Sequence, residues 1–125
     1  MIYGVGTDIV SLNRIEKLHK KYGKAFADRL LSRIDLLEYP QAGSPANFLA
    51  KRFVAKEAFA KAVGTGLRSP VSLRNIGIGH DELGKPEFYC EPELQQWLEE
   101  KGIKCVHLSM SDEEDKVLAF AVAEK

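Results

Sequence analysis

Cysteine is scarce in this 125-residue chain, and no long apolar run is present. Cys90 and Cys105 have neither CxxC spacing nor a nearby histidine pair, so we expect two buried thiols in a reducing cytosol. The longest apolar run, Val117–Ala123, is far shorter than the ~20 residues that a membrane helix needs. The N-terminus lacks a basic region followed by an apolar core, which is how a signal peptide begins. The sequence therefore predicts a cytoplasmic protein without a membrane span.

The chain also lacks a net charge, but its positive and negative residues are distributed unevenly between the two halves of the sequence. Residues 1–56 hold ten Lys and Arg against five Asp and Glu, a balance of +5, and residues 57–125 hold eight against thirteen, a balance of −5. The basic excess lies mainly within residues 14–33. The simplest interpretation is a solvated helix face. The alternative is a docking surface for an anionic partner, which would be an acidic protein, a phosphate or a nucleic acid.

What the chain does contain is typical of one globular domain spanning residues 1–125. Hydrophobic residues make up 45% and charged residues 29%, a balance that argues against disorder. Periodicity and turn signals predict an α+β fold, in which a small antiparallel sheet packs on one long helix with short helices around it. We expect strands over residues 2–10, 71–80, 87–90, 103–110 and 116–123, and helices over 12–22, 25–31, 33–39, 45–63 and 92–101.

The long helix, "PANFLAKRFVAKEAFAKAV", is apolar on nearly all sides, so we expect other elements to enclose it. Glu57 and Lys61 lie one turn apart on it, and a surface ion pair is the simplest interpretation of that spacing. However, Glu57 borders the apolar arc. Gly64, Thr65 and Gly66 follow within a turn, as a loop whose backbone N–H groups could approach a phosphate. The helix therefore contains a candidate anion site.

The first expected strand contains "GVGTDIV", which places a carboxylate beside two glycines. Side chains alternate along a strand, so Gly4, Gly6 and Asp8 share one face, and the glycines allow another backbone or a ligand to come close. If the long helix brings Glu57 to this face, two carboxylates meet beside Lys61. A hard divalent cation would relieve their repulsion, and we predict an Mg²⁺ site there. The alternative is that Asp8 only forms a turn at the strand end.

"GTDIV" together with "RFVAKEAFAKAVGTG" resembles the holo-[acyl-carrier-protein] synthase family, the short branch of the phosphopantetheinyl transferase superfamily. "LGKPEF" and "HLSMSDEEDKVLAFAVAE" fit this family too, so the resemblance covers essentially the whole chain. It implies a Mg²⁺-dependent transfer of the phosphopantetheine arm of coenzyme A to a serine of apo-acyl carrier protein. Adenosine 3',5'-bisphosphate leaves, and the product supports fatty acid biosynthesis. The family also implies a homotrimer with sites between subunits.

The resemblance assigns roles to individual residues. Asp8 and Glu57 would hold Mg²⁺, and Lys61 would contact the phosphates and stabilise charge as the bridge breaks. Residues implied to contact coenzyme A are Lys51, Arg52, Lys61, Gly64, Thr65, Gly66, Pro86, His107 and Ser109. His107 can equally be an ordinary strand histidine. Asp112 stands where several family members carry a histidine, so we assign it no role.

Because acyl carrier proteins are acidic, the family gives the basic segment a partner. Candidate docking residues are Arg14, Lys17, Lys21 and Arg29. Two rival functions remain at this point. A non-catalytic module for acidic proteins or nucleic acid would explain the basic segment but not Asp8 or Glu57. Few aromatic residues alternate with its charges, so we expect no nucleic acid partner. A metal-dependent nucleotide hydrolase would use the same two carboxylates and need no carrier protein.

Overall fold

The computed structural model describes all residues, 1–125, and confirms the α+β class. The strands are β1 (Ile2–Ser11), β2 (Ile76–His80), β3 (Pro86–Cys90), β4 (Cys105–Glu113) and β5 (Lys116–Glu124). The helices are α1 (Leu12–Tyr22), α2 (Lys24–Leu30), α3 (Arg33–Glu38), α4 (Pro45–Ala62) and α5 (Pro92–Glu100), with short 3₁₀ turns at Tyr39–Gln41 and Leu73–Asn75. No helix is long and apolar enough to cross a membrane.

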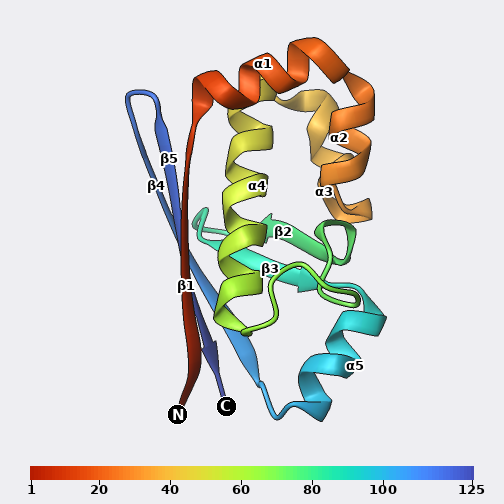
Figure 1. Ribbon diagram of the computed structural model, residues 1–125, viewed down its shortest axis with the longest axis vertical. Helices are drawn as coiled ribbons and strands as arrows, with labels where there is room; N and C mark the ends of the chain where they lie inside the picture. Colours follow the sequence, from red (N-terminus) through yellow and green to blue (C-terminus); the bar gives the residue numbers. More distant parts are fainter.

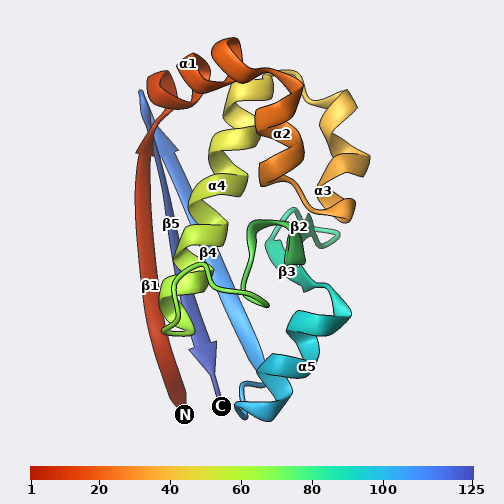
Figure 2. The ribbon, with the colours of Figure 1, turned by 45° about the vertical axis from the view of Figure 1, so that its right-hand side comes forward.

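The elements form three layers with α4 in the middle (Figure 1). One layer is an antiparallel sheet in the order β1-β5-β4, which covers one side of α4. The short helices α2 and α3 and the β2–β3 hairpin lie on the other side of α4 (Figure 2). No element covers the outer face of the three-stranded sheet (Figure 2). The chain ends lie side by side, and the Lys125 N–H donates to the Met1 carbonyl at 2.7 Å.

The prediction that α4 is enclosed is confirmed. Leu49 and Phe59 on one side of it and Val54 and Ala58 on the other are all fully buried. Ser44 is the N-cap, and its hydroxyl accepts a hydrogen bond from the Asn47 N–H at 3.4 Å. This helix therefore forms the core of the molecule, and its charged side chains must find partners or reach the surface.

Three details of the predicted secondary structure are wrong. The chain forms two separate sheets, because β2 and β3 pair only with each other. β2 begins at Ile76 and not at residue 71, because Ser72 caps the 3₁₀ turn and accepts from the Asn75 N–H at 3.3 Å. The last long strand pair is joined by a shorter turn than the expected strands over 103–110 and 116–123 imply, since β4 continues to Glu113. Glu114 makes the reversal in the left-handed region, with φ of 53°.

The prediction of two buried thiols is wrong for one cysteine. Both thiols are free, and Cys90 is half-buried, so that burial raises the pKa of its thiol to about 12. Cys105 is exposed, because it begins β4 on the uncovered face of the sheet. Sequence alone could not assign the face, since a strand with one uncovered side can direct a small thiol either way.

Candidate active site

Asp8 lies on the face of β1 that packs against α4. A Cβ atom on Gly6 would overlap the Ala58 carbonyl oxygen, and one on Gly4 would overlap the Ala62 carbonyl oxygen. The two glycines therefore let the backbones of β1 and α4 touch. This contact fixes Asp8, the next inward-facing residue of the strand, beside the C-terminal half of the helix.

Lys61 connects the helix to the strand at this point. Its Nζ donates to the Thr7 carbonyl oxygen at 2.9 Å and to Asp8 Oδ1 at 3.4 Å. The Asp8 side chain is 20% exposed and that of Lys61 53%, so the ammonium remains accessible to a ligand. The Asp8–Lys61 pair is a link between strand and helix, whereas the sequence suggested a simpler pair within the helix between Glu57 and Lys61.

Glu57 completes the cluster. Burial raises the pKa of its carboxyl, the negative charge of Asp8 raises it further, and the Lys61 ammonium partly offsets both effects. The effect of Asp8 on Glu57 places the two carboxylates near enough to repel each other. The residues Asp8, Glu57 and Lys61 thus form one site, here called the carboxylate site.

The carboxylate site fits a hard divalent cation. Its donors are carboxylate oxygens alone, which Mg²⁺ prefers, and their mutual repulsion is the energy that a bound cation removes. Asp8 and Glu57 would hold the ion and would leave several positions for water and for oxygens of a substrate phosphate. Lys61 adds a positive charge on the same side. The ion would polarise a bound phosphate and reduce its negative charge.

The loop after α4 lies at the end of the same helix. Gly64 and Gly66 have φ of 86° and 66°, in the left-handed region that favours glycine. The Gly66 N–H donates to the Ala60 carbonyl at 3.2 Å, and the Thr65 hydroxyl donates to the Gly66 carbonyl at 2.8 Å. The Gly64 N–H likewise donates to the Lys61 carbonyl at 3.1 Å. The amides of both glycines are therefore already used at the helix C-terminus, and of the three N–H groups expected to approach a phosphate only that of Thr65 is left.

Two other residues expected to contact coenzyme A lie elsewhere. Lys51 and Pro86 line a cavity of about 190 Å³ between α4, the β2–β3 hairpin and β4, together with His80 and Asp112. Lys51 Nζ lies 3.7 Å from Asp112 Oδ2, so Asp112, to which the sequence assigned no role, is the ion-pair partner of Lys51. This cavity borders β4, whereas the carboxylate site borders β1. These are the two opposite edges of the sheet.

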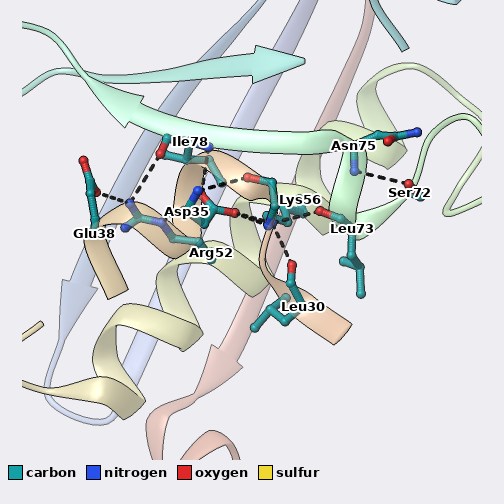
Figure 3. Close-up of polar contacts among 10 residues, drawn as sticks. Leu30, Asp35, Glu38, Arg52, Lys56, Ser72, Leu73, Asn75 and Ile78 are labelled. Atoms are coloured by element: carbon teal, nitrogen blue, oxygen red, sulfur yellow. Dashed lines mark hydrogen bonds and ion pairs between the residues drawn. The ribbon is translucent and has the colours of Figure 1, made fainter. Parts of the chain in front are cut away.

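Arg52, which we also expected to contact coenzyme A, faces the interior of the chain. It is 3% exposed, and its guanidinium donates to Glu38 Oε2 at 2.7 Å, to Asp35 Oδ1 at 3.4 Å and to the Ile78 carbonyl at 3.4 Å. The structure therefore does not bring Arg52 to the carboxylate site. Its charge serves a buried polar network between α3, α4 and β2 (Figure 3).

The centre of this network is a buried ion pair that sequence reasoning missed. Lys56 and Asp35 are both fully buried, and Lys56 Nζ donates to Asp35 Oδ2 at 2.6 Å, to the Leu30 carbonyl at 2.7 Å and to the Leu73 carbonyl at 2.9 Å (Figure 3). All three protons of the ammonium thus have acceptors. A signal was present, because Lys56 follows Leu49 by two helical turns and so shares its buried face.

Asp35 receives hydrogen bonds from several directions. Its Oδ1 accepts from the Ile78 N–H at 3.0 Å, and its Oδ2 accepts from the Ser32 N–H at 2.9 Å. The Asp35 N–H donates in return to Ser32 Oγ at 3.1 Å, which completes a capping box at the start of α3. Burial alone would raise the pKa of Asp35, but the charge of Lys56 and these donors outweigh it and hold the pKa below its ordinary value.

His107 and Ser109 lie on β4 with exposed side chains on the outer face of the sheet. His107 Nε2 lies 2.9 Å from Glu124 Oε1 and 3.3 Å from Cys105 Sγ. The histidine is therefore neither buried nor an isolated strand residue. Neither residue belongs to the carboxylate site of the same chain, which faces α4 across the sheet.

The basic segment contributes to a largely apolar groove, which has one cation, Arg29, in its wall. Arg14, Lys17, Lys21 and Arg29 are all exposed on α1 and α2. Beside them is a cavity of about 420 Å³, lined by Leu18, Tyr22, Ala25, Phe26, Arg29, Leu30, Phe53 and Leu73. An apolar groove with Arg29 in its wall and further exposed cations on the same two helices is suited to a partner helix that has an apolar stripe and acidic flanks.

Known proteins share both this sequence and this fold. Residues 4–121 match the model of the 4'-phosphopantetheinyl transferase superfamily. A holo-[acyl-carrier-protein] synthase from Neisseria meningitidis serogroup A is 73% identical over 125 residues, which are all of both chains. The crystal structure of a holo-[acyl-carrier-protein] synthase from Neisseria meningitidis has a TM-score of 0.98 and 72% identity, again over both whole chains.

A more distant solved structure carries a ligand. The holo-(acyl-carrier-protein) synthase from Bacillus anthracis, in complex with coenzyme A (3',5'-ADP), has a TM-score of 0.82 and 36% identity, covering 100% of this chain and 98% of that one. The match of the family model over nearly the whole chain, the full-length identity and the shared fold agree with one another. The chain belongs to the 4'-phosphopantetheinyl transferase superfamily, in its holo-[acyl-carrier-protein] synthase branch.

Proposed function

We propose that this chain transfers the 4'-phosphopantetheine arm of coenzyme A to a serine of apo-acyl carrier protein, releasing adenosine 3',5'-bisphosphate, and that it does so in the cytoplasm for fatty acid biosynthesis. The observation that supports this most is the meeting of Asp8, Glu57 and Lys61, because Glu57 carries a raised pKa beside the Asp8–Lys61 pair. Relatives named for this activity, one of them with coenzyme A bound, point to the same substrate.

The proposed chemistry is a phosphoryl transfer, which depends on positioning and on charge neutralisation. The serine oxygen forms a bond to the phosphorus that carries the pantetheine arm, and the bond from that phosphorus to the bridging oxygen breaks. The bridging oxygen leaves with its electron pair on adenosine 3',5'-bisphosphate, and the serine proton passes to a water molecule or a nearby carboxylate. Asp8 and Glu57 would hold Mg²⁺, which would supply positive charge to polarise the attacked phosphate. Lys61 lies beside Asp8 with its ammonium accessible, so it can stabilise charge on the leaving bisphosphate.

We also propose a homotrimer with each site between two subunits. The expected coenzyme A residues divide between the β1 edge, with the carboxylate site, and the β4 edge, with the Lys51 and Pro86 cavity. In a closed ring, the β1 edge of one subunit would meet the β4 edge of the next. The carboxylate site of one subunit would then lie beside the Lys51 and Pro86 cavity of its neighbour. The outer face of the sheet is apolar, with Val5 and Phe120 exposed by 55% and 44%, and so offers a surface for this contact.

For the carrier protein, we propose docking on α1 and α2. The exposed cations Arg14, Lys17, Lys21 and Arg29 would attract its acidic surface, and the apolar groove beside them would receive its apolar side chains. Of these residues, Arg14 is the best candidate, because it lies on α1 close in sequence to the end of β1, which carries Asp8. No nucleic acid has a place in this scheme.

The decisive experiment combines the protein with coenzyme A, Mg²⁺ and apo-carrier protein, and then measures the mass of the intact carrier. Gain of the phosphopantetheine mass supports transfer. Release of nucleotide without a change in the carrier supports a hydrolase, and no reaction supports a non-catalytic binding module. Asp8→Ala and Glu57→Ala should each lower turnover by about two to three orders of magnitude, as loss of one preorganised electrostatic group does elsewhere. Turnover near that of the wild type in either variant would contradict the assignment.

A second experiment tests whether each active site is formed by two subunits. We expect Asp8→Ala and Lys51→Ala each to lower turnover. If both edges contribute to one site, a mixture of the two variants should regain activity after the subunits are exchanged, because some interfaces then contain two intact parts. No regain of activity in mixed trimers would show that each chain carries a complete site. Sedimentation of Phe120→Glu gives the matching assembly test, since a charge on the apolar face should favour the monomer.

A further inference from the structure

The apolar groove beside α1 and α2 is built by parts of the chain that are far apart in the sequence. Leu30 ends α2, Phe53 lies on α4, and Leu73 begins the 3₁₀ turn before β2, yet all three line this cavity of about 420 Å³. Local structure cannot fix the spacing of these residues, because each belongs to a different element. Tertiary contacts must therefore hold the groove in shape.

Lys56 supplies such contacts from inside the core. Its ammonium donates to the Leu30 carbonyl at 2.7 Å and to the Leu73 carbonyl at 2.9 Å (Figure 3). Because one nitrogen holds both backbone oxygens, the two groove residues can move apart only if a hydrogen bond breaks. Lys56 is itself fully buried and does not line the groove. Its side chain therefore sets the shape of the groove without touching what the groove would receive.

The two carbonyls depend on this ammonium. Leu30 is the last residue of α2, so its carbonyl has no N–H partner within the helix. An apolar side chain in place of Lys56 would fill the same space but would leave both carbonyls without this donor. The third proton of the ammonium goes to Asp35 Oδ2 at 2.6 Å, and the charge of Asp35 compensates the charge of Lys56 in the core.

The groove also lies close to the carboxylate site. Phe53 precedes Glu57 by four residues, so the two side chains share a face of α4 and lie about 6 Å apart along the helix axis. A side chain of the carrier protein that packs against Phe53 would bring its neighbours near Glu57 and the phosphate expected there. The spacing of the groove walls thus affects how the carrier protein is placed, whereas coenzyme A and Mg²⁺ depend on other residues.

We infer that Lys56 is a positioning residue for the carrier protein, because through Leu30 and Leu73 it holds the groove in the shape that receives this partner. The inference rests on the proposed transfer activity and on docking at α1 and α2. It gives the buried Lys56–Asp35 pair a role in substrate recognition in addition to its role in stability.

Two variants separate recognition from stability. Asp35→Asn keeps Lys56 and its two carbonyl contacts, whereas Asp35→Asn combined with Lys56→Met removes the donor together with both charges. Lys56→Met alone is unsuitable, since it would leave the charge of Asp35 buried without a partner. The double variant should raise KM for apo-acyl carrier protein roughly tenfold, because two groove side chains must then be ordered on binding. Asp35→Asn should keep the KM of the wild type, although it is the less stable of the two variants.

Loss of folded protein cannot give this result, because it lowers turnover and leaves every KM unchanged. KM for coenzyme A and the Mg²⁺ concentration for half-maximal turnover should therefore stay at their wild-type values in the double variant. Leu98→Ala is a second destabilised control, since Leu98 is buried on α5, at the other end of the molecule from α1 and α2 (Figure 1). It should keep the KM for carrier protein, whereas Leu73→Ala, which truncates one groove wall directly, should raise it.

The outcomes distinguish this inference from the function on which it rests. A wild-type KM for carrier protein in the double variant, with a raised KM in Leu73→Ala, would overturn the role of Lys56 alone. An equal rise of this KM in Asp35→Asn or Leu98→Ala would show a general loss of stability and would also overturn it. A wild-type KM in Leu73→Ala would exclude the groove as the docking site, and absence of transfer by the wild type would overturn the proposed function itself.

Discussion

Replacement of Asp35 by asparagine should remove a large part of the free energy that keeps this protein folded. The change keeps the size of the side chain and removes only its charge. In the wild type, Asp35 is the buried partner of Lys56 at 2.6 Å, and it also accepts from Arg52 at 3.4 Å. Asp35→Asn leaves the Lys56 ammonium fully buried with two backbone carbonyls and no counter-charge.

The magnitude follows from this loss. Removing one member of a buried ion pair costs about 3–5 kcal/mol, because the remaining charge stays out of water without compensation. That is a large part of the roughly 5–15 kcal/mol by which a domain is stable. For a chain of this length, it corresponds to a decrease in Tm of roughly 12–20 °C. The exposed pair Arg33–Glu91 is the control, and Arg33→Ala should change the stability little, because solvent screens this pair.

The measurement is urea unfolding followed by circular dichroism, at one fixed protein concentration because assembly would shift the midpoint. A double variant, Asp35→Asn with Lys56→Met, removes both charges and should recover part of the loss. If Asp35→Asn were no less stable than Arg33→Ala, the pair would not hold the fold together. If the double variant were as unstable as the sum of the single variants, the two charges would not be coupled.

The pH dependence of this difference follows from the lowered pKa of Asp35. The folded state holds this carboxylate ionised more strongly than the unfolded state does, so at low pH the unfolded chain binds the extra proton first. The stabilisation by Asp35 is complete above the ordinary carboxyl pKa and is lost as the pH falls through the lower pKa of the folded state. The gap between wild type and Asp35→Asn should therefore close in acid. A gap that widened in acid would refute this explanation.

Three further predictions concern the carboxylate site and its surroundings. Gly6→Ala should destabilise the fold by about 1–3 kcal/mol in a thermal melt, because the added Cβ meets the rigid backbone of α4. Gly43→Ala is the control, since a Cβ atom there has no neighbour within 4 Å and should not lower the Tm. Equal Tm values for the two variants would refute the close contact. Protons compete with Mg²⁺ for Glu57, so the Mg²⁺ concentration for half-maximal turnover should fall as the pH rises through its raised pKa, and the metal-free protein should lose stability over the same range. An unchanged half-saturation from pH 5 to 8 would contradict this. Arg14→Glu should raise KM for carrier protein with little change in KM for coenzyme A, and equal loss for both substrates would exclude Arg14 as a docking residue.

The sequence by itself determined most of the local structure and indicated which residues are candidates for the chemistry. The alternation of Gly4, Gly6 and Asp8 indicated a strand face that another backbone approaches, and the apolar surround of α4 indicated a central helix. The capping box of Ser32 and Asp35 was readable from its spacing. These features could be predicted because they depend on periods of two or 3.6 residues along the chain.

Tertiary structure alone decided which distant residues meet and which faces remain open. The pairing of Lys61 with Asp8, and of Lys56 with Asp35, joins elements that are far apart in the sequence. The exposure of Cys105 beside Glu124 depends on the register between β4 and β5. The periodic pattern of apolar residues reports only on the local structure of one segment. Which residues of α4 contact which neighbours depends on how all three layers pack together. The charges inside the core were therefore visible in the sequence, but their partners were not.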